Sequence, residues 1–193
     1  YRTELFRLRM QLSLWDLIQA LDKKFIVHDC LLPDHRKQLI EDCKPFLRRL
    51  SEQHPAYQSD APLRKYAEFD SVHKTFDYIA QHCLQTELIP YEHSSWFIMT
   101  QGKEDQYLMH NHPADYVGVY YMNSHPSFTN GTEFEEYGLV EVPENSMVIF
   151  PGHLMHTPPR FKCSEYFERY TMSLNWNFKR SWQGTLNTFR CMG

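Results

Sequence analysis

The chain of 193 residues carries a formal net charge of −4, and 42% of its residues are hydrophobic, 15% aromatic and 23% charged. This length and composition suit one domain with a sizeable core, and they exclude a collagen, a coiled coil and a membrane protein. The negative charge argues against a general nucleic-acid binder, which needs a positive surface.

The first 90 residues have mainly helical periodicity. A first helix is predicted from apolar residues that recur every three or four positions, Leu5, Leu8, Leu12, Trp15 and Ile18. An extended piece over residues 25–32 is stopped by Pro33. A second helix is predicted to carry Leu39, Ile40, Cys43, Phe46 and Leu47, with Pro45 kinking or ending it. Residues 54–68 have the composition of a loop, and a third helix is predicted over about 70–88.

From Ser95 onward the apolar residues alternate with period two, which is typical of strands. Turn residues separate seven predicted strands, at 96–100, 106–112, 116–123, 132–136, 139–142, 146–150 and 166–178. So many short strands favour a barrel or sandwich over a parallel sheet. We therefore expect one mainly β structural domain, in which an N-terminal helical segment (1–90) packs on a β core (91–193).

The last predicted strand has two different faces. Its alternate residues form a polar set, Arg169, Thr171, Ser173, Asn175 and Asn177, and an apolar set, Tyr170, Met172, Leu174, Trp176 and Phe178. The apolar set is expected to pack against the core or the helices. The polar set is either solvated or lines a barrel interior, and the nearby histidines favour the interior.

Three histidines have spacing suited to a metal site. His110 and His112 are two positions apart, so in an extended segment both imidazoles point to the same side. His156 lies on a later segment and is the third candidate ligand, with His153 as the alternative. Two ligands from one strand and one from another form a three-residue face, which leaves other metal positions open for substrate and oxygen.

Three motifs together resemble a known enzyme family. They are His110-Asn-His-Pro-Ala-Asp-Tyr-Val-Gly-Val-Tyr-Tyr-Met-Asn123, Phe150-Pro-Gly-His-Leu-Met-His156 and Arg169-Tyr-Thr-Met-Ser-Leu-Asn175. In order and spacing they resemble 2-oxoglutarate/Fe(II)-dependent oxygenases, most closely a small group whose first motif reads HxH-P before a GVYY strand. The resemblance covers about residues 95–180. It implies a double-stranded β-helix (jelly-roll, cupin-like) barrel that uses Fe(II), 2-oxoglutarate and O2.

The resemblance also implies roles for the histidines. The usual triad is an HxD or HxE pair plus a distal histidine. Here His110 takes the first position, His112 the carboxylate position and His156 the distal position. Halogenating relatives have a small residue at the carboxylate position, so His112 favours a three-histidine iron site over halogenation. Asp115 stays an alternative carboxylate.

Further residues match the family's co-substrate pocket. Arg169 lies 13 positions beyond His156, where the family places the basic residue that binds 2-oxoglutarate, and Thr171 would add a hydroxyl to the same carboxylate. Tyr121 and Asn175 are expected to line the pocket. A shift of one residue in strand register would exchange Tyr121 for Tyr120.

The five cysteines are odd in number and never form a CxxC pair. We therefore expect no disulfide framework and interpret the protein as cytoplasmic. No apolar run reaches the ~18 residues of a membrane span, and no signal-peptide pattern opens the chain, so no membrane partner is expected.

The resulting hypothesis is an Fe(II)- and 2-oxoglutarate-dependent hydroxylase with succinate and CO2 as co-products. Its substrate is an unidentified small molecule or protein, and the sequence indicates no oligomeric state. Two alternatives are a three-histidine cupin-type dioxygenase that does not use 2-oxoglutarate and a non-catalytic jelly-roll binding module.

Overall fold

A computed structural model describes residues 24–51, 54–92, 94–101, 108–125, 129–159 and 167–179. The helices are α3 (Pro33–Cys43) and α4 (Asp70–Leu84), with short 3-10 turns η1 (Lys44–Phe46), η2 (Leu63–Lys65) and η3 (Ala67–Phe69). The strands are β1 (Phe25–Val27), β2 (Leu47–Ser51), β3 (His54–Ser59), β4 (Leu88–Pro90), β5 (Trp96–Gln101), β6 (Tyr116–Tyr121), β7 (Gly131–Phe134), β8 (Gly138–Glu141), β9 (Ser146–Pro151), β10 (His156–Thr157) and β11 (Glu168–Phe178). The first predicted helix lies outside the described residues.

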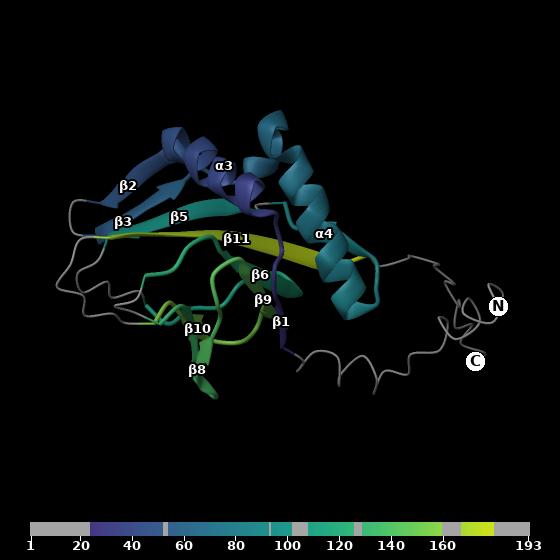
Figure 1. Cartoon of the computed structure of the whole chain (residues 1–193). Helices are drawn as coiled ribbons and strands as arrows, with labels where there is room; N and C mark the ends of the chain where they lie inside the picture. Colours follow the sequence, from purple (N-terminus) through teal and green to yellow (C-terminus); the bar gives the residue numbers. More distant parts are fainter. Residues whose placement is uncertain are drawn as a thin grey trace, which may run out of the picture.

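The strands form two antiparallel sheets. The large sheet has the order β1-β9-β6-β11-β5-β3-β2, with β4 paired to the end of β11. The small sheet has the order β10-β7-β8. In Figure 1 the helices α3 and α4 lie over one face of the large sheet, and β8 and β10 lie on the other side. The described residues of the first half thus contribute four strands to the large sheet as well as both helices.

Apolar and polar residues alternate along β11, and this determines which layer packs against each face of the large sheet. Its apolar residues Tyr170, Met172, Leu174 and Trp176 belong to the core that also contains Phe69 and Phe76 from the helical layer. Trp176 and both phenylalanines are fully buried, and each such aromatic contributes roughly 2–3 kcal/mol through burial. The polar residues of β11 therefore face the small sheet, as their predicted interior position requires.

The helices end for local reasons. Pro45 lies two residues after the end of α3, within η1, so the predicted helix stops at Cys43, and Leu47 belongs to β2 rather than to the helix. Helix α4 stops at Leu84 because Gln85 adopts a left-handed conformation, with φ of 53°, whose N–H donates to Gln81 O. The chain then extends into β4, which the third predicted helix had included in part.

The prediction of a loop over 54–68 was wrong for its first six residues. Residues 54–59 form β3, which pairs with β2 on one side and with β5 on the other. Pro55 lies outside the β5 pairing, which runs from Ala56 to Gln58, so its missing N–H costs no hydrogen bond with that strand.

The other strands follow the predicted alternation. Six of the seven predicted strands correspond to β5, β6, β7, β8, β9 and β11. The seventh, 106–112, is not a strand in its described part: His110 forms only an isolated bridge with His156. The two-residue strand β10 was not predicted.

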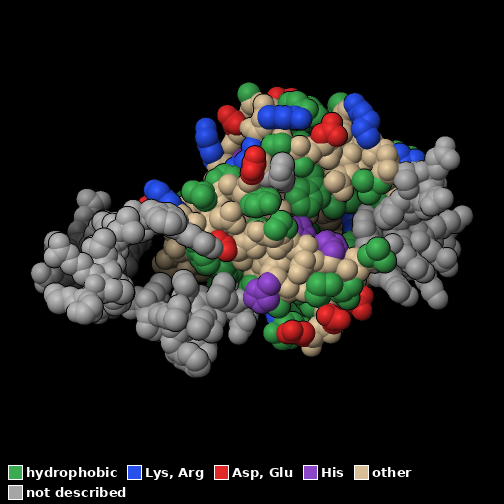
Figure 2. All heavy atoms as spheres, turned by 180° about the vertical axis from the view of Figure 1, so that it is seen from behind, with side chains coloured by type: hydrophobic (Ala, Val, Ile, Leu, Met, Phe, Trp, Pro, Cys, Tyr) green, Lys and Arg blue, Asp and Glu red, His purple; other side chains and the backbone are tan. Residues whose placement is uncertain are grey.

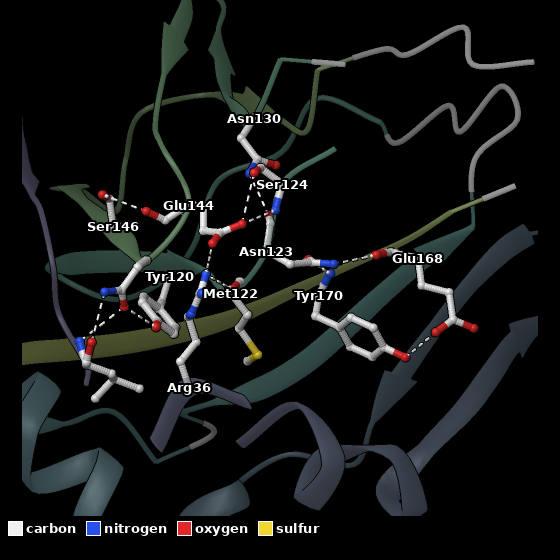
Figure 3. Close-up of polar contacts among 12 residues, drawn as sticks. Arg36, Tyr120, Met122, Asn123, Ser124, Asn130, Glu144, Ser146, Glu168 and Tyr170 are labelled. Atoms are coloured by element: carbon white, nitrogen blue, oxygen red, sulfur yellow. Dashed lines mark hydrogen bonds and ion pairs between the residues drawn. The ribbon is translucent and has the colours of Figure 1, made fainter. Parts of the chain in front are cut away.

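A polar network lies at one end of the β6–β9 pair (Figure 3). Glu144 forms an ion pair with Arg36 and accepts hydrogen bonds from the backbone N–H and hydroxyl of Ser124, both at 2.9 Å. Tyr120 donates its hydroxyl proton to Asn145 Oδ1 at 2.7 Å. In the β6–β9 register Tyr121 pairs with Ser146 at this end and Tyr116 with Pro151 at the other.

No helix in the described ranges is both long and apolar enough to cross a membrane. Cys30, Cys43 and Cys83 are free thiols. Figure 2 views the molecule from behind and shows histidine side chains reaching this face. The lysine and arginine side chains visible in the same view gather mainly over its upper part, the part formed by the helical layer.

Candidate metal centre

Three histidines lie close together beside the end of the β6–β9 pair at which Tyr116 pairs with Pro151. His110 and His156 form a two-residue bridge, in which His110 N donates to His156 O at 3.0 Å and His156 N donates to His110 O at 2.8 Å. His112 follows on the same extended segment as His110. One ligand nitrogen of each ring lies within 4.8 Å of those of the other two. The two chain segments thus form the three-residue face that the spacing predicted.

Hydrogen bonds set the tautomer of all three rings. His110 Nδ1 lies 2.9 Å from Leu108 O, and His156 Nδ1 lies 2.9 Å from Leu154 O. A carbonyl oxygen can only accept, so each Nδ1 must carry the proton. His112 Nδ1 likewise donates to Asn175 Oδ1 at 2.9 Å. In the neutral rings the lone pair therefore lies on Nε2, which makes Nε2 the nitrogen that can bind a metal ion.

The electrostatics of the cluster keep two of the rings neutral. Burial lowers the pKa of His112 to about 4, with a further contribution from the neighbouring His110, against the opposing hydrogen bond to Asn175. Burial likewise lowers the pKa of His156 to about 3. His156 is 4% exposed, whereas His110 is exposed. At neutral pH the lone pairs of both buried rings are therefore available to a metal ion.

Aromatic rings hold the cluster in place. The Trp96 ring stacks on His112, with centroids 5.6 Å apart and planes 12° apart. Phe150 packs edge-on against His156, with centroids 4.7 Å apart. Both contacts restrict rotation of the histidine rings.

A cavity of about 400 Å³ lies against the three histidines. It lies between the polar face of β11 and the small sheet, and its lining includes all four predicted residues Arg169, Thr171, Tyr121 and Asn175. The described lining residues include three histidines and one arginine, Arg169, but no aspartate or glutamate. The cavity therefore suits an anionic ligand near Arg169.

The sheet register places these residues at different depths. Thr171 is opposite Tyr121 on β6 and Ile98 on β5, whereas Asn175 is opposite Val117, nearer the histidines. Arg169 is opposite Thr100 and is only 2% exposed. Because β11 rises about 3.4 Å per residue, Arg169 and Asn175 lie at opposite ends of the β11 face that lines the cavity.

The register also decides between the two tyrosines. Tyr121 lines the cavity and shares a 2.6 Å hydrogen bond with Thr132 on the small sheet. Tyr120 lies on the helical face. Burial raises the pKa of Tyr121 to about 12, although the Arg169 charge and the Thr132 hydrogen bond lower it. Tyr121 therefore stays protonated and can donate a hydrogen bond.

The two alternative ligands lie elsewhere. His153 is exposed and is not part of the histidine cluster. Asp115 Oδ2 accepts a hydrogen bond from Phe178 N at 2.8 Å, and Asp115 is not among the described residues that line the cavity. The structure thus brings His110, His112 and His156 together without either alternative.

Sequence reasoning missed two parts of the cavity wall. Gln58 on β3 lines the cavity, but it falls in the stretch that was predicted to be a loop. The run Ala56, Tyr57 and Gln58 does not alternate apolar with polar residues, so the sequence offered no clear signal for this strand. Thr132 lies on a predicted strand, but nothing in the sequence indicated that its hydroxyl would face Tyr121.

No family model and no curated protein matches this sequence. The fold, in contrast, is similar to solved structures. HygX from Streptomyces hygroscopicus, with nickel and 2-oxoglutarate bound, has a TM-score of 0.62 at 10% identity, over 88% of this chain and 88% of its own. SnoN, a non-heme alpha-ketoglutarate-dependent epimerase from nogalamycin biosynthesis, has a TM-score of 0.65 at 9% identity, over 92% of this chain and 84% of its own.

A third similar structure is an oxidoreductase of the 2OG-Fe(II) oxygenase family from Burkholderia pseudomallei, with a TM-score of 0.61 at 8% identity, over 80% of this chain and 84% of its own. At such identities the likeness establishes the fold alone. That fold is the double-stranded β-helix of 2-oxoglutarate/Fe(II) oxygenases, which confirms the predicted fold class.

Proposed function

We propose that this protein is an Fe(II)- and 2-oxoglutarate-dependent oxygenase that hydroxylates a small-molecule or protein substrate. One observation carries the proposal: a cluster of three histidines lines the same cavity as a buried arginine of β11, and one of these histidines is hydrogen-bonded to Asn175 on the same face of that strand. The fold agrees with this assignment. The substrate would enter from the side where His110 is exposed.

The metal would be held by His110, His112 and His156. Their donor set fits a divalent transition metal, because each ring presents a neutral nitrogen fixed by a hydrogen bond at its other nitrogen. Three neutral ligands leave the metal one charge more positive than the usual two histidines and one carboxylate. This favours an anionic co-substrate.

The co-substrate would be anchored by Arg169 and Thr171. A guanidinium presents a planar pair of N–H groups to a carboxylate and stays charged when buried. Thr171 lies on the same strand face, two residues on, and its neighbour Tyr121 is a protonated donor. Arg169 would supply a positive charge, and Thr171 and Tyr121 hydrogen bonds, to one end of 2-oxoglutarate, while its other end would bind the metal.

When bound, Fe(II) and 2-oxoglutarate would supply the oxidising chemistry, in which O2 is consumed and succinate and CO2 are released. The chain's own part is to orient the reactants and to exclude water. Trp96 and Ile98 line the cavity beside the histidines, and such apolar surface keeps water from the reacting centre.

We also propose that the protein works in a reducing compartment such as the cytoplasm. Cys30, Cys43 and Cys83 support this, because all three are free thiols. Burial raises the pKa of Cys30 and of Cys43 to about 12, so neither is a reactive thiolate.

The test is an anaerobic titration of metal-free protein with Fe(II) and then with 2-oxoglutarate, followed by visible absorption. We expect stoichiometric Fe(II) binding and a new charge-transfer band when 2-oxoglutarate chelates the metal. In Arg169→Ala the band should require far more 2-oxoglutarate, because the buried carboxylate loses its charged partner. Arg36→Ala is the matched control: it removes a partly buried arginine of α3, which is not among the described residues that line the cavity, and should leave the band unchanged.

Two results would contradict the proposal. Fe(II) binding without the band, and with turnover independent of 2-oxoglutarate, would identify a three-histidine dioxygenase of the cupin type. Absence of stoichiometric Fe(II) binding by an intact fold would identify a non-catalytic binding module.

A further inference from the structure

The turn between β4 and β5, described at residues 91, 92, 94 and 95, lies directly behind the candidate metal centre. Tyr91 N donates to Asn175 O at 3.0 Å, and Asn175 N donates to Ser94 Oγ at 3.4 Å. Asn175 is the residue that accepts the Nδ1 proton of His112. The turn thus holds the backbone of Asn175 on both its N–H and C=O sides.

The same turn also sets the position of Trp96. Trp96 follows Ser95 directly in the chain and stacks on the His112 ring. Ser95 is fully buried and has a φ of 71°, in the left-handed region that non-glycine residues rarely adopt. Such a conformation persists only where surrounding contacts enforce it. The hydrogen bond from the His112 ring to Asn175 and the stacking of this ring on Trp96 therefore both depend on this turn or its neighbour.

A group of polar side chains on the helical layer holds the turn from behind. His73 Nε2, on α4, lies 2.8 Å from Ser95 Oγ, and Arg64 Nε, on η2, donates to Ser94 Oγ at 3.4 Å. Leu63 N adds a backbone hydrogen bond to Ser95 O at 3.0 Å. The two serine hydroxyls and the carbonyl group of Ser95 thus connect the turn to the helical layer.

Asp77 on α4 fixes Arg64 in turn. The carboxylate accepts two hydrogen bonds from the guanidinium, at 2.8 and 2.5 Å, and Trp176 Nε1 donates to it at 2.7 Å. The side chains of Arg64 and Asp77 are 18% and 23% exposed, so solvent replaces their partners poorly. Trp176 follows Asn175 on β11, so Asp77 contacts the strand that carries Asn175 directly and the turn through Arg64.

We propose that Arg64, His73 and Asp77 are positioning residues for the metal centre, acting through Ser94 and Ser95 on Asn175 and Trp96 and so on the orientation of His112. This inference rests on the proposed function, because it assigns His112 to a metal. It adds a route by which residues of the helical layer, on the far side of the sheet, set the ligand geometry. Removal of the direct hydrogen-bond partner of a ligand, which Asn175 is for His112, typically changes metal affinity by about 10–100-fold.

The variants are chosen so that the fold survives. Ser94→Ala removes the acceptor for Asn175 N and for Arg64 Nε while leaving the ion pair intact. Asp77→Asn keeps an acceptor for the Trp176 indole but removes the charge that holds Arg64. Glu144→Gln is the matched control, since it breaks the partly buried ion pair with Arg36 at the other end of the β6–β9 pair (Figure 3) and touches neither the turn nor β11.

The measurements are the Kd for Fe(II), by anaerobic titration, and the Tm of each metal-free protein. We expect Ser94→Ala and Asp77→Asn to weaken Fe(II) binding by about tenfold or more. We expect Glu144→Gln to lower the Tm to an extent similar to Asp77→Asn and to change the Kd by less than about twofold. A Kd that stays within twofold in Ser94→Ala and Asp77→Asn, while their Tm falls, would overturn the proposal and leave these residues a structural role.

A second readout needs no metal. The Nδ1 proton of His112 gives a slowly exchanging proton NMR signal while Asn175 accepts it, and the signal is assigned by its absence from His112→Asn. We expect Ser94→Ala to shift or broaden this signal and Glu144→Gln to leave it unchanged. An unshifted signal in Ser94→Ala would overturn the positioning role. This readout does not depend on Fe(II) binding, whereas a failure to bind Fe(II) would contradict the proposed function by itself.

Discussion

Gly152 lies so close to Ala114 that the two backbones leave no space for a side chain. A Cβ atom on Gly152 would lie 1.9 Å from Ala114 O and 3.1 Å from His112 O. His112 N donates to Gly152 O at 2.9 Å, and Gly152 N donates to Asp115 O at 3.0 Å. This contact fixes the distance between the His112 segment and the turn that leads to His156.

The first prediction concerns Gly152→Ala. The added methyl group meets backbone atoms, which cannot move aside as a side chain can, so the two ligand segments must separate. We expect a stability loss of about 1–3 kcal/mol, the usual cost of overpacking, and weaker Fe(II) binding, because His112 and His156 move apart. Urea unfolding and Fe(II) titration measure the two effects.

Gly131→Ala is the control for this substitution. A Cβ atom there would lie 2.3 Å from Val140 O, a backbone atom of the β7–β8 pair, away from the three histidines. It should lower stability by a similar amount while changing Fe(II) affinity less than Gly152→Ala does. Equal losses of affinity in the two variants would mean that the Gly152 contact has no specific part in ligand spacing.

The second prediction concerns Tyr121→Phe. The hydroxyl of Tyr121 is buried, protonated at neutral pH and shared with Thr132. Its removal deletes one donor near Arg169 without opening a cavity. We expect the 2-oxoglutarate concentration needed for half-maximal band formation to rise several-fold, about 1 kcal/mol for one hydrogen bond, with Fe(II) binding unchanged. An unchanged 2-oxoglutarate requirement would limit Tyr121 to packing against the small sheet.

Local patterns were enough to predict the part of the site that lies on β11. Period-two alternation placed Arg169, Thr171 and Asn175 on one face, and the structure puts that face in the cavity. The same pattern could not choose between Tyr120 and Tyr121, because a register shift of one residue exchanges their faces. The choice depends on pairing with β11, where Tyr121 meets Thr171 across the sheet.

Other features depended on contacts between distant segments. The β2–β3 hairpin was missed because Pro55 and the polar residues around it resemble a loop, whereas its stability comes from pairing with β5, about 40 residues later. The role of Asn175 as acceptor for His112 needs two segments 63 residues apart. Strand β10 was missed because two residues are too few to show any periodicity.

The third prediction concerns His112→Asp. If position 112 is the ligand position that usually holds a carboxylate, this variant should keep Fe(II), whereas His112→Ala should lose it. The centre would then be one charge less positive, so 2-oxoglutarate should bind more weakly than in the parent protein. Anaerobic titration with both ligands checks both directions. Loss of Fe(II) in His112→Asp as complete as in His112→Ala would contradict the assignment of this position.

The fourth prediction concerns the pH dependence of stability and rests on His73, which is 2% exposed and has no contact with the histidine cluster. Burial lowers its pKa to about 4, and the charge of Arg64 lowers it further, against opposing contributions from Asp77 and Asp70. In the unfolded chain the pKa returns to about 6.5. Between about pH 7 and pH 4 the unfolded chain therefore binds more protons than the folded protein, so stability falls as the pH is lowered.

The contribution of His73 is measured by how steeply the free energy of unfolding changes with pH in His73→Gln and in the parent protein. One histidine that stays neutral in the folded state contributes up to about 1.4 kcal/mol per pH unit between the two pKa values. His112 and His156 have lowered pKa values as well and add slopes of the same sign in the metal-free protein. His73→Gln keeps a polar group that can hydrogen-bond to Ser95 Oγ and removes the titrating ring, so its free energy of unfolding should fall less steeply between pH 6.5 and about pH 4.5 than that of the parent protein. Urea unfolding of both metal-free proteins across this range measures the difference, and equal slopes would show that His73 is protonated in the folded state over the same range as in the unfolded chain.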